Sequence, residues 1–256
     1  MIWIYRTLLA GLAIYLAFAA AVFFAQRKMI YFPPDTYAPP PAGFVEVQAA
    51  DGTMGWHAPA QDTRPTVMVF HGNASAIDSN MHIFNDLMSA GYGVWSVGYP
   101  GYPGNAGTPT QSNLTGAAQS QYDTLREMGV EKIVFYGTSL GSAVATQLAA
   151  EKSPDLLILD APFNNMADMT RMHMRWLPTR IMLKDKWYSD RAIAELNVPL
   201  IWLHGTEDQV IPAAQGQKLF DGYNGPKSAH ILQGAHHSNT WFLGGRDITF
   251  SALSSL

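Results

Sequence analysis

A short turn between a strand-like run and a helix-like run constrains the fold of this chain more than any other feature. Residues 137–141 read Gly-Thr-Ser-Leu-Gly, after the apolar run 132–136 and before the helix-like run 142–150. A G-x-S-x-G turn in this context is typical of a nucleophile elbow, in which flanking glycines let strand and helix pack closely. The pattern favours Ser139 as an exposed nucleophile over an ordinary glycine-flanked turn.

The composition excludes several classes of site and partner. The chain has 256 residues, which suffice for one large α/β domain. Its net charge of −4 gives no electrostatic case for nucleic-acid binding, and no residue is a cysteine, which excludes disulfides, zinc–thiolate sites and a cysteine nucleophile. His57, His82, His173 and His230 stand singly, without metal-ligand spacing. The sequence therefore predicts no metal and no cofactor.

The N-terminal segment differs from the rest of the chain. Residues 7–25 contain no charged side chain, and as a helix they span roughly 28 Å, close to the hydrocarbon thickness of a bilayer. Arg6 lies before this stretch, and Arg27 and Lys28 follow it. We expect residues 1–28 to form an uncleaved membrane anchor, the alternatives being a signal peptide and a buried core helix.

Strand-like and helix-like segments alternate through the remaining domain, residues 29–256. Strands are expected at 45–48, 52–58, 66–70, 93–97, 132–136, 156–160, 199–203 and 230–232. Helices are expected at 79–90, 111–128, 142–150 and 213–220 and near the C-terminus. Continuous apolar strands alternating with helices predict an α/β fold with a mostly parallel central sheet flanked by helices.

One segment interrupts this alternation. Between Asp160 and Pro199 the chain is longer than a crossover requires and is rich in methionine and tryptophan. We interpret residues 163–190 as a small helical cap whose soft side chains line an apolar acyl pocket. We give equal weight to a second interpretation, in which these side chains are only the packing face of a crossover helix. The residues of that face would be Met166, Met169, Met172 and Trp176.

A serine nucleophile needs a base and an orienting acid. In a chain with this order of strands and helices, the acid follows the serine, and the histidine that serves as base follows the acid. Asp208 follows the apolar strand that ends in His-Gly-Thr-Glu-Asp, and Asp160 at the end of the preceding strand is the alternative acid. Two adjacent histidines lie after the last strand. The spacing favours His237 as the base, with His236 as the alternative.

The oxyanion of a tetrahedral intermediate requires backbone N–H donors. The first expected donor is Leu140, directly after the serine, and the second is Asn73, in the loop that begins His71-Gly72 after strand 66–70. The imidazole of His71 is expected to brace this loop.

These motifs resemble those of the bud-emergence-type membrane-anchored α/β-hydrolases. The resemblance begins with the apolar anchor and covers essentially the whole chain, and the matching segments are residues 26–34, 69–74, 98–109, 137–141, 161–163, 183–186 and 204–208. Pro103 and Ala106 vary the loop motif, and Asp160 stands where the family commonly has a glutamate-like residue. The resemblance implies an α/β-hydrolase fold, serine-hydrolase activity and a triad of Ser139, Asp208 and His237.

Taken together, these features predict a serine hydrolase that cleaves carboxylic ester or thioester bonds through an acyl-enzyme. The expected substrate is a small lipophilic acyl compound delivered from the membrane that holds the anchor. The flanking charges nearly balance, and we expect the domain after the anchor to be extracytoplasmic. The alternatives are a serine peptidase or acyltransferase with the same triad, or a non-catalytic membrane-anchored binding protein.

Overall fold

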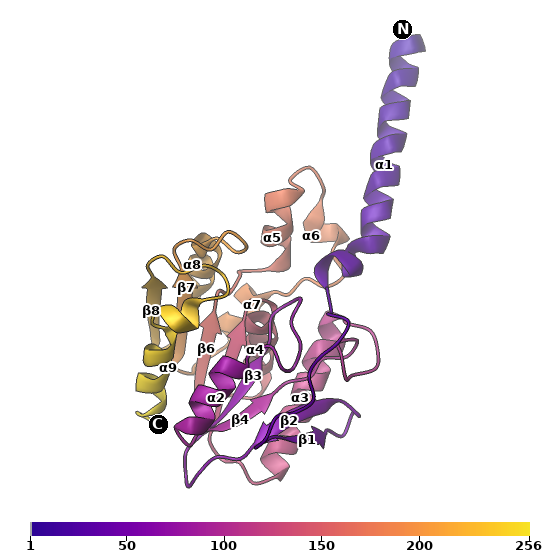
Figure 1. The fold of residues 1–256 in the computed structure, drawn as a ribbon. Coiled ribbons are helices and arrows are strands. Elements are labelled where there is room, and N and C mark those ends of the chain that lie inside the picture. The colour runs from indigo at the N-terminus through magenta and orange to yellow at the C-terminus, as the bar shows by residue number, and fades with distance from the viewer. Residues whose placement is uncertain (1) are drawn as a thin grey trace.

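The computed structural model describes residues 2–256, and Figure 1 shows a layered α/β domain from which one long helix projects. The strands are β1 (Val45–Gln48), β2 (Met54–Ala58), β3 (Thr66–Phe70), β4 (Gly93–Ser96), β5 (Ile133–Thr138), β6 (Leu156–Asp160), β7 (Leu200–Gly205) and β8 (Lys227–Leu232). The helices are α1 (Ile2–Ile30), α2 (Met81–Ser89), α3 (Gln111–Glu127), α4 (Leu140–Glu151), α5 (Met166–His173), α6 (Thr179–Met182), α7 (Ser189–Ala194), α8 (Ala213–Asp221), the 3₁₀ helix η1 (Thr240–Leu243) and α9 (Gly245–Leu253).

The strands form one eight-stranded sheet in the order β1-β2-β4-β3-β5-β6-β7-β8. β2 runs antiparallel to both β1 and β4, and every pair from β4 to β8 is parallel. The predicted α/β-hydrolase fold with a mostly parallel sheet is confirmed. Because parallel strands share one carboxyl edge, the loops that carry the candidate site residues meet there.

The central strands of the sheet are buried on both faces. Alternate residues of β3 point to opposite sides, so that Met68 packs in the core on one face and Val67 in the core on the other. Phe135 and Val134 of β5 repeat this alternation. This two-sided burial explains the continuous apolar runs in the sequence.

A small cap follows β6 and covers the carboxyl edge of the sheet. It contains α5 and α6, which stand on the side of the molecule from which α1 projects (Figure 1). The segment expected to form a small helical cap thus contains two short helices. Pro178 lies immediately before α6 and separates the two.

The end of α1 is joined to the cap by polar contacts. Arg27 Nε lies 2.9 Å from the Asp185 carboxylate. The Gln26 amide donates to the carbonyl oxygen of Met182 at 3.2 Å and accepts from the backbone N–H of Lys184 at 2.7 Å. These partners extend the helix to Ile30, beyond the charged residues at which the sequence predicts the anchor to end.

Candidate active site

Ser139 occupies a strained turn between β5 and α4. Its backbone adopts φ 54° and ψ −118°, a conformation that non-glycine residues rarely take. A Cβ at Gly137 would lie 2.6 Å from the carbonyl oxygen of Gly141, and a Cβ at Gly141 would overlap the carbonyl of Phe70. The two glycines are therefore required by close backbone approach, which is the geometry of a nucleophile elbow.

Asp208 and His237 are joined by a short hydrogen bond. His237 Nδ1 lies 2.7 Å from Asp208 Oδ2, and Asp208 Oδ1 accepts from the backbone N–H groups of Val210 and Ile211 at 2.8 Å each. Burial alone would raise the pKa of Asp208, but hydrogen bonds from His204, His237 and Ile211 outweigh it and hold this pKa well below its ordinary value. Asp208 is therefore an ionised, fixed partner for the imidazole.

His204 is a second support for Asp208, to which sequence reasoning assigned no role. The Trp202 indole donates to His204 Nδ1 at 3.1 Å, which assigns the ring proton to Nε2. This Nε2 lies 2.8 Å from the carbonyl oxygen of Ile211 and 3.4 Å from Asp208 Oδ2. The signal in the sequence is the His-Gly-x-x-Asp spacing, which places His204 at the end of β7 under the acid loop.

His236 points away from Asp208. Its Nδ1 lies 3.2 Å from the carbonyl oxygen of Glu207, and its Nε2 lies 3.5 Å from the Glu207 carboxylate. Both side chains are more than half exposed. The geometry thus favours His237 over its neighbour as the partner of the acid.

Two backbone N–H groups are available beside Ser139. Leu140 is the first residue of α4 and has no carbonyl of an earlier helical turn to which it could donate. The Asn73 N–H donates to no protein acceptor within residues 2–256. Gly72 brings the Asn73 loop close, since a Cβ there would lie 3.4 Å from the Ser139 Cβ.

His71 supports the loop that carries Asn73. Burial lowers its pKa to about 4, so the ring is neutral. Its Nδ1 lies 2.9 Å from the Gly72 carbonyl oxygen, and its ring packs on that of Tyr99 with centroids 4.2 Å apart. These contacts match the bracing role that the sequence indicates.

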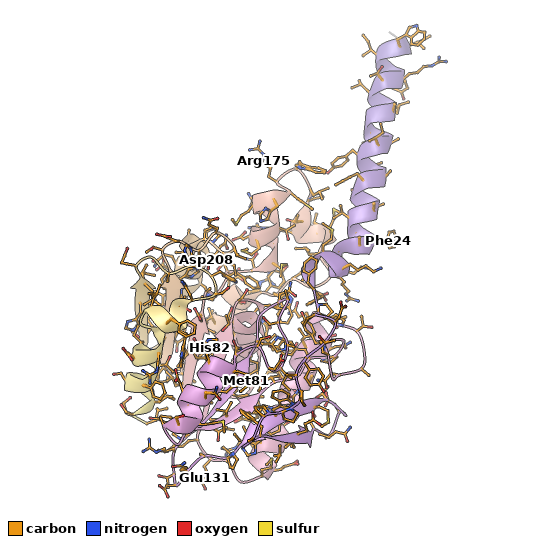
Figure 2. All side chains as sticks on the ribbon, viewed as in Figure 1. Phe24, Met81, His82, Glu131, Arg175 and Asp208 are labelled. Carbon is orange, nitrogen blue, oxygen red and sulfur yellow. The ribbon has the colours of Figure 1, made fainter. Side chains whose placement is uncertain are left out.

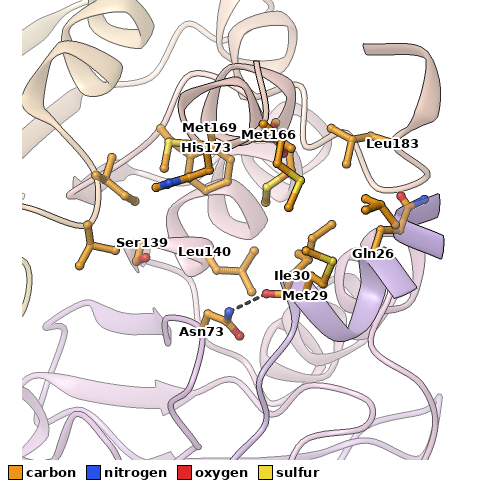
Figure 3. Close-up of a pocket in the computed structure, with 16 residues that line it drawn as sticks. Gln26, Met29, Ile30, Asn73, Ser139, Leu140, Met166, Met169, His173 and Leu183 are labelled. Carbon is orange, nitrogen blue, oxygen red and sulfur yellow. Dashed lines mark hydrogen bonds between the residues drawn. The ribbon is translucent and has the colours of Figure 1, made fainter. Parts of the chain in front are cut away.

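The Asn73 side chain connects this loop to the end of α1. Its amide donates to the carbonyl oxygen of Ile30 at 2.5 Å (Figure 3), and its Oδ1 accepts from the Phe32 backbone N–H at 2.8 Å. The hydroxyl of Tyr102 donates to the same oxygen at 2.9 Å. Sequence reasoning missed this connection, because it joins segments about forty positions apart.

Asp160, the alternative acid, is occupied elsewhere. Its Oδ2 accepts from the hydroxyls of Thr240 at 2.6 Å and Tyr136 at 3.2 Å. Burial raises its pKa to about 6, a shift that these hydrogen bonds only partly oppose. Its backbone carbonyl accepts from the Ser139 N–H at 2.9 Å, so the residue holds the elbow in place.

An apolar cavity of about 410 Å³ begins at Ser139 and ends against α1 (Figure 3). Met166 and Met169 line it from the cap, whereas Met172 and Trp176 do not. The full lining is Val22, Gln26, Met29, Ile30, Asn73, Ser139, Leu140, Phe163, Met166, Met169, Thr170, His173, Met174, Leu183, Val210 and Ile211. Met166 and Met169 thus both line the cavity and pack against the core, as the two interpretations of this segment expected.

A smaller cavity of about 200 Å³, lined mostly by polar residues, also adjoins Ser139 and is called the polar cavity. Ser139 and His237 both line it, although no hydrogen bond joins these two side chains in the part of the chain that the structure describes. Its remaining lining is Gly72, Asn73, Ser75, Ser79, Asn80, His82, Ile83, Thr138, Asp160, Ser238, Thr240 and Trp241. Ser139 therefore stands where an apolar and a polar cavity meet.

No group of three potential metal-ligating side chains occurs among residues 2–256.

Comparisons with known proteins agree with this geometry. Residues 65–192 match the family model described as the alpha/beta hydrolase fold. An uncharacterized protein of Mycobacterium tuberculosis is 32% identical over 234 residues, which cover 86% of this chain and 83% of that protein. Lysophosphatidylserine lipase ABHD12 of Danio rerio is 30% identical over 204 residues, which cover 71% of this chain and 53% of the lipase.

A solved structure shows the same fold. The Pyrococcus furiosus esterase Pf2001 superposes with a TM-score of 0.68 at 17% identity, covering 88% of this chain and 96% of the esterase. The family match, the relatives and the strand order lead to one conclusion: the chain belongs to the alpha/beta hydrolase fold family and is a hydrolase.

Proposed function

We propose that this protein is a serine hydrolase that cleaves carboxylic ester or thioester bonds of lipophilic acyl substrates. Ser139 is the nucleophile, His237 the base and Asp208 the orienting acid. The observation that carries the proposal is the position of Ser139 between the apolar cavity and the polar cavity lined by His237. One cavity fits an acyl chain, and the other fits a polar leaving group.

The chemistry follows from this arrangement. Ser139 Oγ attacks the carbonyl carbon while His237 Nε2 takes the hydroxyl proton, and Asp208 stabilises the resulting imidazolium. The oxyanion accepts hydrogen bonds from the backbone N–H groups of Asn73 and Leu140. Collapse expels the alcohol or thiol, which takes the proton from His237, and a water activated by His237 then releases the carboxylic acid and restores Ser139.

Two further observations support a lipid-like substrate. Residues that line the apolar cavity include Met29 and Ile30 at the end of α1, the helix that is long and apolar enough to cross a membrane. One relative is named as a lysophosphatidylserine lipase, an enzyme for an ester with one acyl chain and a polar head. We accordingly propose that α1 anchors the protein in a membrane. We also propose that the domain after it lies on the extracytoplasmic side.

Labelling with a fluorophosphonate probe tests the nucleophile. The full-length protein in detergent should be labelled, Ser139→Ala should not, and Ser251→Ala, which removes an exposed hydroxyl in α9, should behave as the unsubstituted protein. Labelling that persists in Ser139→Ala, or a folded unsubstituted protein that stays unlabelled, contradicts the proposal.

A panel of p-nitrophenyl esters and matched thioesters of increasing acyl length tests the substrate class. The apolar cavity predicts that kcat/KM rises from the acetyl to the octanoyl substrate, because each added methylene buries more apolar surface. Faster turnover of acetyl than of octanoyl esters would argue against a lipophilic acyl group.

A further inference from the structure

The surroundings of α1 change in the middle of the helix. Every side chain from residue 2 to residue 18 is exposed. From Ala19 onwards many side chains pack against the rest of the protein, and Gln26 is fully buried. Only the first part of the helix is therefore free to face lipid on all sides.

The cap touches α1 at this change of surroundings. The Tyr15 hydroxyl donates to the carbonyl oxygen of Trp176 at 3.1 Å, and the rings of Phe18 and Trp176 lie 4.8 Å apart. Tyrosine and tryptophan, with an apolar body and a polar tip, are enriched where hydrocarbon meets water.

The cap segment, residues 171–184, combines exposed apolar and cationic side chains. Met172, Trp176 and Ile181 are 45%, 51% and 84% exposed. The segment contains no acidic residue, in a chain whose net charge is −4, and its exposed basic residues are Arg171, Arg175, Arg180 and Lys184. Arg180 also lies 3.9 Å from the Asp168 carboxylate but remains 71% exposed.

The position of this segment matches that of the helix. Figure 2 shows Arg175 at the tip of the cap, directed away from the sheet and on the side from which α1 projects. A surface with apolar groups among cations is typical of protein that rests on an anionic bilayer.

We propose that the cap segment rests in the interface of an anionic phospholipid bilayer, and that the membrane surface crosses α1 at Tyr15–Phe18 rather than near Arg27. The membrane-spanning part is then residues 2–18, roughly 25 Å of helix, which is at the short end of the range that crosses a bilayer and requires the hydrocarbon to thin slightly around it. Arg6 lies near the far end of this part, where its side chain reaches the opposite headgroups. Residues 19–30 lie outside the hydrocarbon and belong to the hydrolase domain.

Cysteine accessibility tests where the membrane surface lies, since the natural chain has no cysteine. Ala10→Cys and Ala21→Cys both alter a small exposed residue of α1. The full-length variants are placed in nanodiscs, which leave both membrane faces open, and are treated with a charged maleimide. We expect Ala21→Cys to react at least about tenfold faster than Ala10→Cys, because thiol reactivity requires access to water. Equal, slow reaction at both positions would put the surface near Arg27 and overturn the proposal.

Lipid-borne quenchers test the seating of the cap. Ile181→Cys carries a bimane label, and the exposed Met128→Cys, at the C-terminal end of α3, is the control. Met128 precedes Glu131, which Figure 2 shows at the end of the domain opposite α1. Doxyl lipids in anionic nanodiscs should quench the label at 181 and not at 128. If acrylamide in the water quenches both labels and the lipids quench neither, the cap faces water or a protein partner and the proposal fails.

A separate experiment tests whether the cap segment prefers anionic lipid. In nanodiscs of phosphatidylcholine alone, or in an Arg171→Gln/Arg175→Gln/Arg180→Gln variant with an unchanged melting temperature, lipid quenching at 181 should weaken. Unchanged quenching in both cases would overturn the preference for anionic lipid. All these measurements are independent of enzymatic activity.

Discussion

Asp208 is the most constrained side chain of the candidate site. Val210 and Ile211 occupy one carboxylate oxygen, and His237 and His204 approach the other. A carboxylate with this many donors cannot rotate freely, so the imidazole it holds keeps a fixed direction. The proposed triad therefore depends on the acid loop as much as on the histidine itself.

The adjacent histidines give a direct test of this arrangement. His237→Ala should lower kcat/KM for a soluble ester by about 10³-fold or more, because it removes the general base. His236→Ala should stay close to the unsubstituted protein, since its ring contacts only Glu207 among the acidic residues described. An inactive His236→Ala together with an active His237→Ala would transfer the base to position 236.

Asp160 predicts a pH dependence of stability. Its pKa is raised to about 6 by burial, so between about pH 4 and pH 6 the folded state keeps a proton that the unfolded state has lost. The contribution of Asp160 to the free energy of unfolding should therefore fall as the pH rises through this window, by roughly 2–3 kcal/mol, while the buried His71, with a pKa lowered to about 4, contributes in the opposite direction. Asp208 has a lowered pKa and contributes in the opposite direction, mainly below about pH 4.

Urea unfolding of the full-length protein in detergent measures this effect. The free energy of unfolding of the unsubstituted protein minus that of Asp160→Asn, which cannot titrate, should fall as the pH rises from 4 to 6. Equal slopes for the two proteins would show that Asp160 keeps an ordinary pKa.

At the scale of elements, α4 can pack closely against β3 and β5 because Gly141 has no side chain. The Cβ added in Gly141→Ala would overlap the Phe70 carbonyl. We expect this variant to destabilise the fold by about 3 kcal/mol or more, because neither the backbone of α4 nor that of β3 can move away without disrupting its own packing. Gly116→Ala in α3 meets nothing within 4 Å and should stabilise the protein by about 0.5–1 kcal/mol. Melting temperatures compare the two, and similar values would refute the steric argument.

Some elements could be predicted from the sequence because their apolar runs are continuous. The buried strands β3, β5 and β6 are of this kind. The edge strand β8 begins at Lys227, earlier than predicted, because its first residues are polar and exposed and carry no such signal. The elbow and the acid and histidine loops were predictable because each is a local motif that follows a strand.

Other parts of the candidate site could not be predicted, because they depend on contacts between distant segments. The Asn73 side chain bonds to Ile30 and Phe32, which lie about forty positions earlier in the chain. The end of α1 at Ile30 has the same cause, since the sequence shows the charges of Arg27 and Lys28 but not the partners on the cap.

At the scale of the whole molecule, the apolar cavity is enclosed jointly by α1, the cap and the elbow. Val22 lines the cavity from α1, so Val22→Trp should shorten the space for an acyl chain. We expect the ratio of kcat/KM for p-nitrophenyl dodecanoate to that for the butyrate to fall about tenfold, as for a small change in an apolar pocket. Ala21→Trp, on an exposed neighbouring position, should leave this ratio unchanged. Equal ratios for the two variants would show that acyl chains do not reach α1.

The bonds between Asn73 and the exit of α1 also bear on how the protein could be released. A protease that cut between Val22 and Gln26 would free the domain, but it would cut away Val22 and weaken the hold on the helix end that bonds the Asn73 loop. Shedding would then yield a soluble fragment with an open pocket and a loosened oxyanion loop. On the proposed mechanism, a domain cut free after Val22 loses activity, and only a cut nearer the membrane surface, before Ala19, would release it with its pocket intact.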